Sequence, residues 1–95
     1  MHTFDQEYEW DEQKAASNLA KHGVDFTDAA VAVEDKGALT VPDEGSREER
    51  YVSFGLDGHG RLLAVVYSWR GDVMRIISAR KATLTEARFY TAANR

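Results

Sequence analysis

Apolar residues recur at the spacing of an α-helix in two stretches of the first half of the chain. The first stripe consists of Ala15, Ala16, Leu19 and Ala20, and the second of Phe26, Ala29, Ala30 and Val33. Residues three and four apart share one face of a helix, so each stripe can be buried against a core. Asp11 and Asp25 precede the stripes as N-caps, and Gly23 follows the first stripe as a C-cap. The pattern predicts helices near residues 11–22 and 25–35.

Between residues 37 and 80 the apolar residues alternate or run together as they do in β-strands. Val52, Phe54 and Leu56 alternate with polar or aromatic neighbours. The span 61–69 is apolar almost throughout, so we expect it to be an interior strand that is covered on both faces. Turn residues separate the runs. The pattern predicts an antiparallel meander with strands near residues 38–42, 50–56, 61–70 and 73–80.

The two ends of the chain complete the predicted fold. Residues 1–9 are expected to form a weakly ordered lead or a short extended segment. Thr83 and Glu86 have the spacing of a capping box, which predicts a last helix from about residue 84. The fold class is therefore α+β, with two N-terminal helices, a four-stranded antiparallel sheet and a C-terminal helix. Its 95 residues have the length of a single domain, 1–95.

The segment from Arg75 to Arg80 is unusual because an apolar strand carries an arginine at each end. Strict alternation would place Ile76, Ser78 and Arg80 on one face, and Arg75 with Ile77 and Ala79 on the other. A hydroxyl beside a guanidinium suits an anion. The alternative is that both arginines pair with acids and only solubilise the ends of the strand.

The net charge of −4 conceals a division between the two halves of the chain. Residues 1–49 carry 13 acidic and 4 basic residues, a net charge of −9, whereas residues 50–95 carry 3 acidic and 8 basic residues, a net charge of +5. The basic half can form an arginine-lined surface that attracts phosphate. The alternative is that the two halves neutralise each other in the fold.

Composition excludes several kinds of site. The chain has no cysteine, so it has neither disulfides nor thiolate zinc sites. Its 3 histidines, His2, His22 and His59, lack the spacing of metal ligands, and there is no glycine-rich phosphate loop and no nucleophile elbow. We therefore expect no metal and no cofactor. There is no long apolar run and no leader, so we also expect a cytoplasmic protein without a membrane contact.

The remaining polar groups suit the cleavage of RNA by its own 2′-hydroxyl. This reaction needs a base for that hydroxyl, a proton donor for the leaving oxygen, and cations for the charge that builds on the phosphate. Arginine suits the last role because its planar fork binds two phosphate oxygens and stays charged. Histidine or a carboxylate suits the other two roles.

An ordered series of short blocks resembles the BrnT toxins. The matching residues are Trp10-Asp11, Lys14, Asn18, Lys21-His22-Gly23-Val24, Phe26, Ala29, Glu49-Arg50, Arg75-Ile76-Ile77-Ser78-Ala79-Arg80, Ala82, Glu86 and Tyr90. The resemblance spans about residues 8–90. It implies a RelE/ParE-like fold and a ribonuclease that blocks translation.

The same resemblance implies a partner. Toxins of this family are neutralised by a BrnA-like antitoxin, a ribbon-helix-helix protein encoded beside them, and the complex represses its own operon. This chain has no DNA-reading motif of its own, so contact with DNA would be indirect, through the antitoxin.

The polar members of the matching blocks are the candidate site residues. We predict catalytic roles for Arg80, Arg50, His22 and Glu49, and substrate binding by Lys21, Arg75, Ser78 and Tyr90. Arg80 leads because alternation places it beside Ser78 at an accessible strand end. Lys21 and His22 have a structural alternative, since cations in the last turn of a helix complement its dipole. Glu86 is explained by the capping box alone.

Two other functions remain open at this stage. The chain could be a non-catalytic module that binds the antitoxin and contributes to repression of the operon. It could also be a plain α+β domain with structural arginines. A neighbouring gene with a ribbon-helix-helix pattern would eliminate the latter, and expression of the chain alone would separate enzyme from module.

Overall fold

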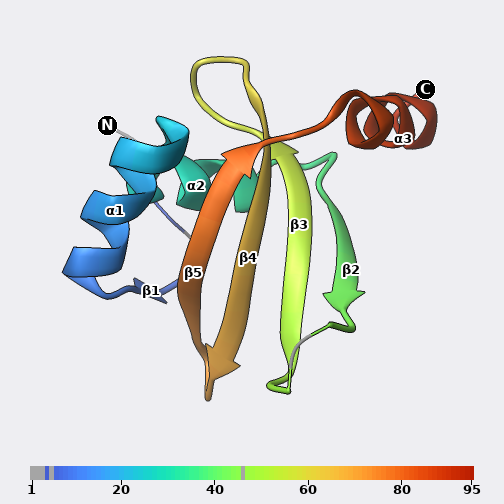
Figure 1. Cartoon of the computed structure of the whole chain (residues 1–95). Coiled ribbons are helices and arrows are strands. Elements are labelled where there is room, and N and C mark those ends of the chain that lie inside the picture. Colours follow the sequence, from blue (N-terminus) through green and yellow to red (C-terminus); the bar gives the residue numbers. More distant parts are fainter. Residues whose placement is uncertain (1–3, 5, 46) are drawn as a thin grey trace.

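The computed structural model describes residues 4, 6–45 and 47–95 of the chain. Its elements are β1 (Tyr8–Glu9), α1 (Glu12–His22), α2 (Phe26–Val33), β2 (Leu39–Asp43), β3 (Arg50–Leu56), β4 (Leu62–Arg70), β5 (Val73–Lys81) and α3 (Leu84–Ala93) (Figure 1). The two N-terminal helices, the four strands of the meander and the last helix are confirmed, with small shifts at their ends.

The sheet contains one strand more than predicted. Its order is β1-β5-β4-β3-β2, and β2 to β5 form the expected antiparallel meander. β1 pairs in parallel with β5, with Tyr8 opposite Met74 and Glu9 opposite Arg75. The prediction of a four-stranded, purely antiparallel sheet is therefore wrong, because the sheet is five-stranded and mixed. A two-residue strand is too short to produce a recognisable alternation.

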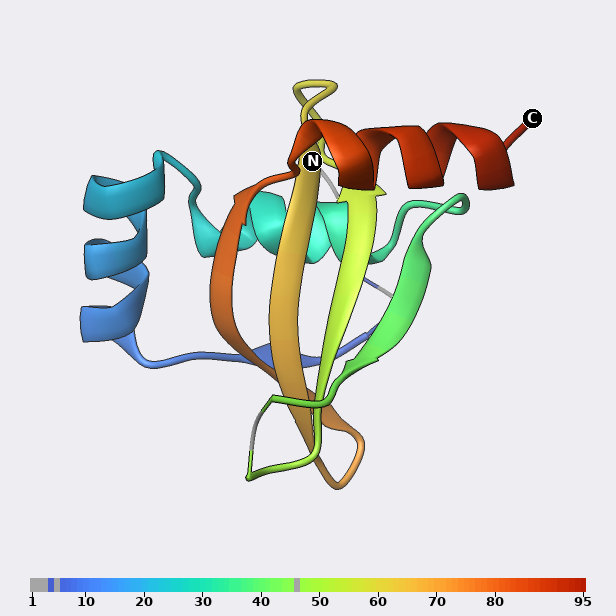
Figure 2. The ribbon, with the colours of Figure 1, turned by 45° about the vertical axis from the view of Figure 1, so that its right-hand side comes forward.

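The helices lie on different sides of the sheet. α2 packs on β3, β4 and β5, α1 lies along β5, and α3 crosses the end of the opposite face, where it contacts β3 (Figure 2). We call the side that carries α2 the helix face and the opposite side the open face. The core lies between α2 and the helix face, where Phe26, Leu63 and Ile76 are fully buried. Burial of such side chains is the main stabilising term of a domain this small.

A glycine permits the close contact between α2 and β3. A Cβ atom added to Gly55 would lie 2.0 Å from the backbone oxygen of Ala32. Only a residue without a side chain allows the helix backbone to approach the strand so closely.

The interior position of β4 is confirmed, but its coverage on both faces is not. β4 lies between β5 and β3. Towards its C-terminal end Val66 and Ser68 are only half-buried on the open face, and Trp69, which alternates onto the helix face, is 45% exposed. α3 reaches only the other end of the open face (Figure 2). The lower half of that face is therefore available for contact with a ligand.

The predicted helix caps are confirmed. The Asp11 carboxylate accepts hydrogen bonds from the backbone N–H groups of Gln13 and Lys14, and Gly23 ends α1 with a φ of 70°. Asp25 caps α2, and Thr83 and Glu86 form both bonds of the capping box at α3. The N-caps satisfy N–H groups that have no partner within the helix, whereas the Gly23 N–H donates to the Leu19 carbonyl at the C-terminal end of α1.

A β-bulge in β5 changes which side chains face which way. Ser78 lies opposite Val66, but Ile76 lies opposite the next residue, Tyr67, so Ile77 is left without a partner. As a result Ile76 points into the core with Ala79, while Arg75 faces the open side with Ser78 and Arg80. The predicted pairing of Ser78 with Arg80 is correct, but the faces predicted for Ile76 and Arg75 are wrong. Alternation fails wherever one strand holds an extra residue.

α3 is attached by polar contacts more than by burial, since none of its residues is buried. The Tyr90 hydroxyl donates to Asp35 at 2.5 Å, and the Asn94 amide donates to the Gly37 carbonyl at 3.0 Å. The hydrogen bond to Asp35 raises the pKa of Tyr90 to about 12, because ionisation would place two negative charges side by side. Within the described ranges, no helix has the length and apolar character needed to cross a bilayer.

Candidate functional site

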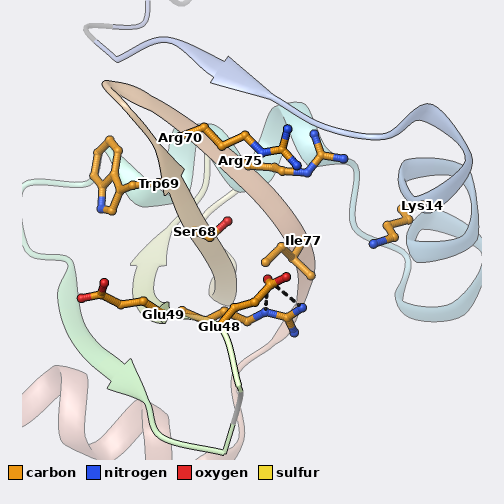
Figure 3. A pocket seen from close by; sticks show the side chains of 9 residues that line it. Lys14, Glu48, Glu49, Ser68, Trp69, Arg70, Arg75 and Ile77 are labelled. Carbon is orange, nitrogen blue, oxygen red and sulfur yellow. Dashed lines mark hydrogen bonds and ion pairs between the residues drawn. The ribbon is translucent and has the colours of Figure 1, made fainter.

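A shallow pocket of about 410 Å³ lies at the end of the sheet where β3 begins and β4 ends (Figure 3). We call it the arginine pocket. It is lined by Lys14, Glu48, Glu49, Arg50, Ser68, Trp69, Arg70, Arg75 and Ile77. Four of these side chains are cations, so the pocket is suited to an anion that presents several oxygens.

Three neighbouring strands supply the arginines of this pocket. Arg50 is the first residue of β3, Arg70 is the last of β4, and Arg75 lies opposite Ser68 near the start of β5. Antiparallel pairing brings these strand ends together at one rim of the sheet. The bulge at Ile77 is required as well, since it turns Arg75 onto the open face.

Carboxylates from the acidic half partly neutralise the pocket. Glu9 binds Arg75 with an N–O distance of 2.7 Å. Glu48 lies 3.4 Å from Arg50, and the dashed lines in Figure 3 join these two side chains. The Glu48 side chain is 68% exposed, so its attraction to Arg50 is screened by water. The alternative that the acidic and basic halves of the chain neutralise each other's charge is thus correct for the pair of Glu9 and Arg75.

A second, smaller pocket of about 220 Å³ adjoins the first. It lies between α1 and β5, and we call it the helix pocket. It is lined by Lys14, Ser17, Asn18, Lys21, His22, Ile77 and Ser78. Lys14 and Ile77 line both pockets, so the two adjoin, and we call the two pockets together the groove.

Asn18 fixes α1 against the edge of β5. Its amide donates to the carbonyls of Ala79 at 2.8 Å and Val24 at 3.0 Å, and its side-chain oxygen accepts from the Ala79 N–H at 3.0 Å. The amide thereby takes the place of a neighbouring strand at this point. Because the same helix carries Lys14, Lys21 and His22, this contact sets the position of three groups that line the groove.

The predicted site residues are distributed over several places. Arg50, Glu49 and Arg75 line the arginine pocket, and Lys21, His22 and Ser78 line the helix pocket. Arg80 and Tyr90 line neither of these two pockets. Tyr90 holds α3 through Asp35, and Arg80 is bound by Glu86 through two hydrogen bonds of 2.8 and 3.0 Å.

The pair of Arg80 and Glu86 should stabilise the fold in a pH-dependent way. The hydrogen bonds from Arg80 lower the pKa of Glu86 from 4.5 to about 2. A lowered pKa contributes stability that is complete above the unfolded value and disappears as the pH falls towards the folded value. The contribution is therefore lost between pH 4.5 and about 2.

We expect Glu86→Gln to lower the free energy of unfolding by about 1 kcal/mol at pH 7, allowing for the partial exposure of Arg80. Glutamine can still accept the Thr83 N–H bond of the capping box, so the substitution tests the charge. Urea unfolding of both proteins should give free energies that converge as the pH falls from 4.5 towards 2. A difference that stays constant with pH would mean that the Arg80 pair contributes nothing.

Sequence reasoning missed six residues of the arginine pocket: Lys14, Glu48, Ser68, Trp69, Arg70 and Ile77. Arg70 and Trp69 were assigned only to the predicted strand 61–70, with no role in a site. The register of β4 against β5 would have indicated Ser68 and Arg70, because these two residues alternate onto the face that the bulge gives to Arg75. No group of three or more potential metal ligands occurs among the residues that the structure describes.

Fold and site together define a small α+β protein with a cation-lined groove at the strand ends of its sheet. The family model described as "Ribonuclease toxin, BrnT, of type II toxin-antitoxin system" matches residues 10–86. The chain belongs to this family of ribonuclease toxins.

A solved structure supports this assignment. The crystal structure of the Brucella abortus ribonuclease toxin BrnT has 28% sequence identity to this chain and superposes with a TM-score of 0.66. The match covers 82% of this chain and 97% of the Brucella chain. No curated protein sequence matches the chain.

Proposed function

We propose that this protein is a toxin that cleaves RNA without a metal ion and thereby inhibits translation. The observation that carries the proposal is the arginine pocket, in which Arg50, Arg70 and Arg75 converge with Lys14. A phosphodiester within single-stranded RNA provides the matching anion, and fixed cations stabilise the charge of its transition state.

The proposed reaction uses the 2′-hydroxyl of the substrate as the nucleophile. A base removes its proton, the oxygen attacks the adjacent phosphorus, and the bond from phosphorus to the 5′-oxygen breaks. The leaving oxygen takes up a proton. The products are a 2′,3′-cyclic phosphate and a 5′-hydroxyl, so no water, metal or cofactor is consumed.

The geometry favours some of the predicted roles over others. Arg50 and Arg75 are assigned to the phosphate, together with Arg70. His22 is the preferred proton-transfer group, because it lines the helix pocket, which shares Lys14 and Ile77 with the arginine pocket. Glu49 turns away from Arg70 and Arg75 (Figure 3). Lys21 and Ser78 would contact a neighbouring nucleotide.

Arg80 and Tyr90 keep their predicted roles only as weaker proposals. The fork of Arg80 is already occupied by Glu86, and the hydroxyl of Tyr90 by Asp35. A role in catalysis would require each of them to exchange its present partner for RNA.

The membership of a toxin–antitoxin family implies an antitoxin partner. We propose a BrnA-like ribbon-helix-helix protein, with DNA reached only through it, a cytoplasmic site of action, and residues 1–95 acting as one RelE-like domain. The second candidate, a non-catalytic module that contributes to operon repression, is favoured by the carboxylates that already neutralise Arg50 and Arg75.

Expression of the chain alone tests the proposal. We expect growth arrest with loss of RNA, relieved when the neighbouring gene is expressed as well. The purified chain should cleave single-stranded RNA in the presence of a chelator and leave 5′-hydroxyl ends. Harmless accumulation together with intact RNA would support the non-catalytic module instead.

A further inference from the structure

The arginine pocket contains one aromatic residue whose exposure its packing does not explain. Trp69 is 45% exposed, whereas Tyr67, two residues earlier on the same strand, is 4% exposed. The rings of Trp69 and Tyr67 meet nearly at right angles, at 87° and with centroids 6.1 Å apart. Such an edge-to-face contact occupies at most one face of the indole, so a planar ligand can stack on the rest.

The Tyr67 ring that contacts Trp69 is itself held in place by neighbouring residues. Tyr51 stacks on Tyr67 at a centroid distance of 6.0 Å, and the Tyr67 hydroxyl lies 3.0 Å from that of the buried Ser53. The ring of Tyr67, on which Trp69 packs, is therefore fixed by contacts within the sheet. A rigid aromatic surface loses little conformational freedom when it binds a ligand.

A carboxylate lies on the same side as the indole. The Tyr51 hydroxyl donates to one oxygen of Glu49 at 2.8 Å. Figure 3 shows Trp69 and Glu49 on one side of the strand ends, with Arg70 and Arg75 on the other. Trp69 and Arg70 are the last two residues of β4. Because side chains alternate along a strand, the indole of Trp69 and the guanidinium of Arg70 lie on opposite faces of the sheet.

We propose that Trp69 and Glu49 form a nucleobase subsite at the rim of the sheet, and that it prefers guanine. The base would stack on Trp69 while its neighbouring phosphate binds Arg70 and Arg50 across the rim. A carboxylate accepts up to about four hydrogen bonds, so Glu49 can retain Tyr51 and accept adjacent N–H donors from the base. Guanine presents two such donors on one edge. Uracil and cytosine present fewer. This inference rests on the proposed cleavage of RNA and names the base that the same site selects.

The test uses oligonucleotides that bind but are not cleaved. The probes are 2′-O-methyl uridine hexamers that carry, at one central position, guanosine, uridine or an abasic residue. We expect the guanosine hexamer to bind about tenfold more tightly than the abasic one, a factor within the range of base–aromatic stacking. Both should show the same dependence on salt, because they carry the same phosphates.

Variants of the two subsite residues separate stacking from hydrogen bonding. In Trp69→Ala, the affinity for the guanosine hexamer should fall to that for the abasic hexamer. In Trp69→Phe, most of the difference in affinity between these two hexamers should be retained. Glu49→Gln should remove the preference for guanosine over uridine while the affinity for the abasic hexamer does not fall. In the variant Trp10→Phe, Trp69 is the remaining tryptophan. Binding of the guanosine hexamer should quench the fluorescence of Trp69 in this variant.

The outcomes distinguish this inference from the proposed function. Tight, salt-dependent binding with equal affinity for all three hexamers would overturn the nucleobase subsite and leave the arginine pocket standing. A base preference that survives Trp69→Ala would overturn it too. If the unchanged protein binds no hexamer, both the subsite and RNA cleavage are overturned.

Discussion

Replacing Arg50 with alanine is expected to lower the rate of RNA cleavage by about 10²–10³-fold, which is the usual cost of removing one fixed charge donor from a transition state. Arg50 begins β3 and lines the arginine pocket. Among the residues that the structure describes, the exposed Glu48, at 3.4 Å, is the carboxylate that competes for its guanidinium. Arg50→Lys should recover little activity, because an ammonium cannot bind two phosphate oxygens in a planar fork.

Arg47→Ala is the matched control for this experiment. It removes the same charge from the segment that leads into β3, but Arg47 does not line the arginine pocket. Cleavage by the control should stay within about threefold of the unchanged protein. Both variants should keep the same thermal melt, since Arg50 lies on the half-exposed open face. Full activity of Arg50→Ala would remove the arginine pocket from the mechanism.

Replacing Asn18 with leucine is expected to have the largest effect on stability. Asn18 is buried, and its amide makes three hydrogen bonds to the backbone of Val24 and Ala79. Leucine has a similar volume but leaves these backbone groups without partners inside the protein. Unsatisfied groups of this kind cost about 1–3 kcal/mol each, so we expect the free energy of unfolding to fall by about 2–4 kcal/mol.

Urea unfolding measures this effect, with Gln13→Ala as the control. Gln13 carries the same amide in the same helix, but its side chain is exposed, so its loss should change stability by about 0.5 kcal/mol or less. Asn18→Leu should also weaken RNA binding in conditions where the protein stays folded, because α1 carries Lys14 and His22. An unfolding free energy equal to that of the control would show that the amide is dispensable.

The parts of the fold that depend on neighbouring residues could be predicted from the sequence. The caps Asp11, Gly23 and Thr83 act within one turn of a helix, and their residue types are nearly sufficient to identify them. The strands of the meander were found for a similar reason, since each is an apolar run bounded by turn residues. No knowledge of distant contacts was needed.

The parts that depend on pairing between distant residues could not be predicted. β1 is defined only by its contact with β5, more than sixty residues away along the chain, and the contact of Asn18 with Ala79 spans 61 residues. The bulge exists only relative to β4, so the side on which Arg75 emerges is fixed by the register of two strands. This is why Arg70 and Lys14 were not predicted to line the arginine pocket. The pair of Arg80 and Glu86 spans only six residues, and it was missed because the capping box alone already explained Glu86.

The bulged residue also has a consequence for the evolution of this groove. Ile77 pairs with no residue of β4, yet it is one of two side chains shared by the arginine pocket and the helix pocket. A change of side chain there alters the shape of the groove without altering a strand partner. Loss of the residue would leave Arg75 and Ser78 on the same face, because regular alternation would then run through the strand. A substitution at position 77 would therefore change the lining of both pockets while the strand pairing of the sheet is left intact.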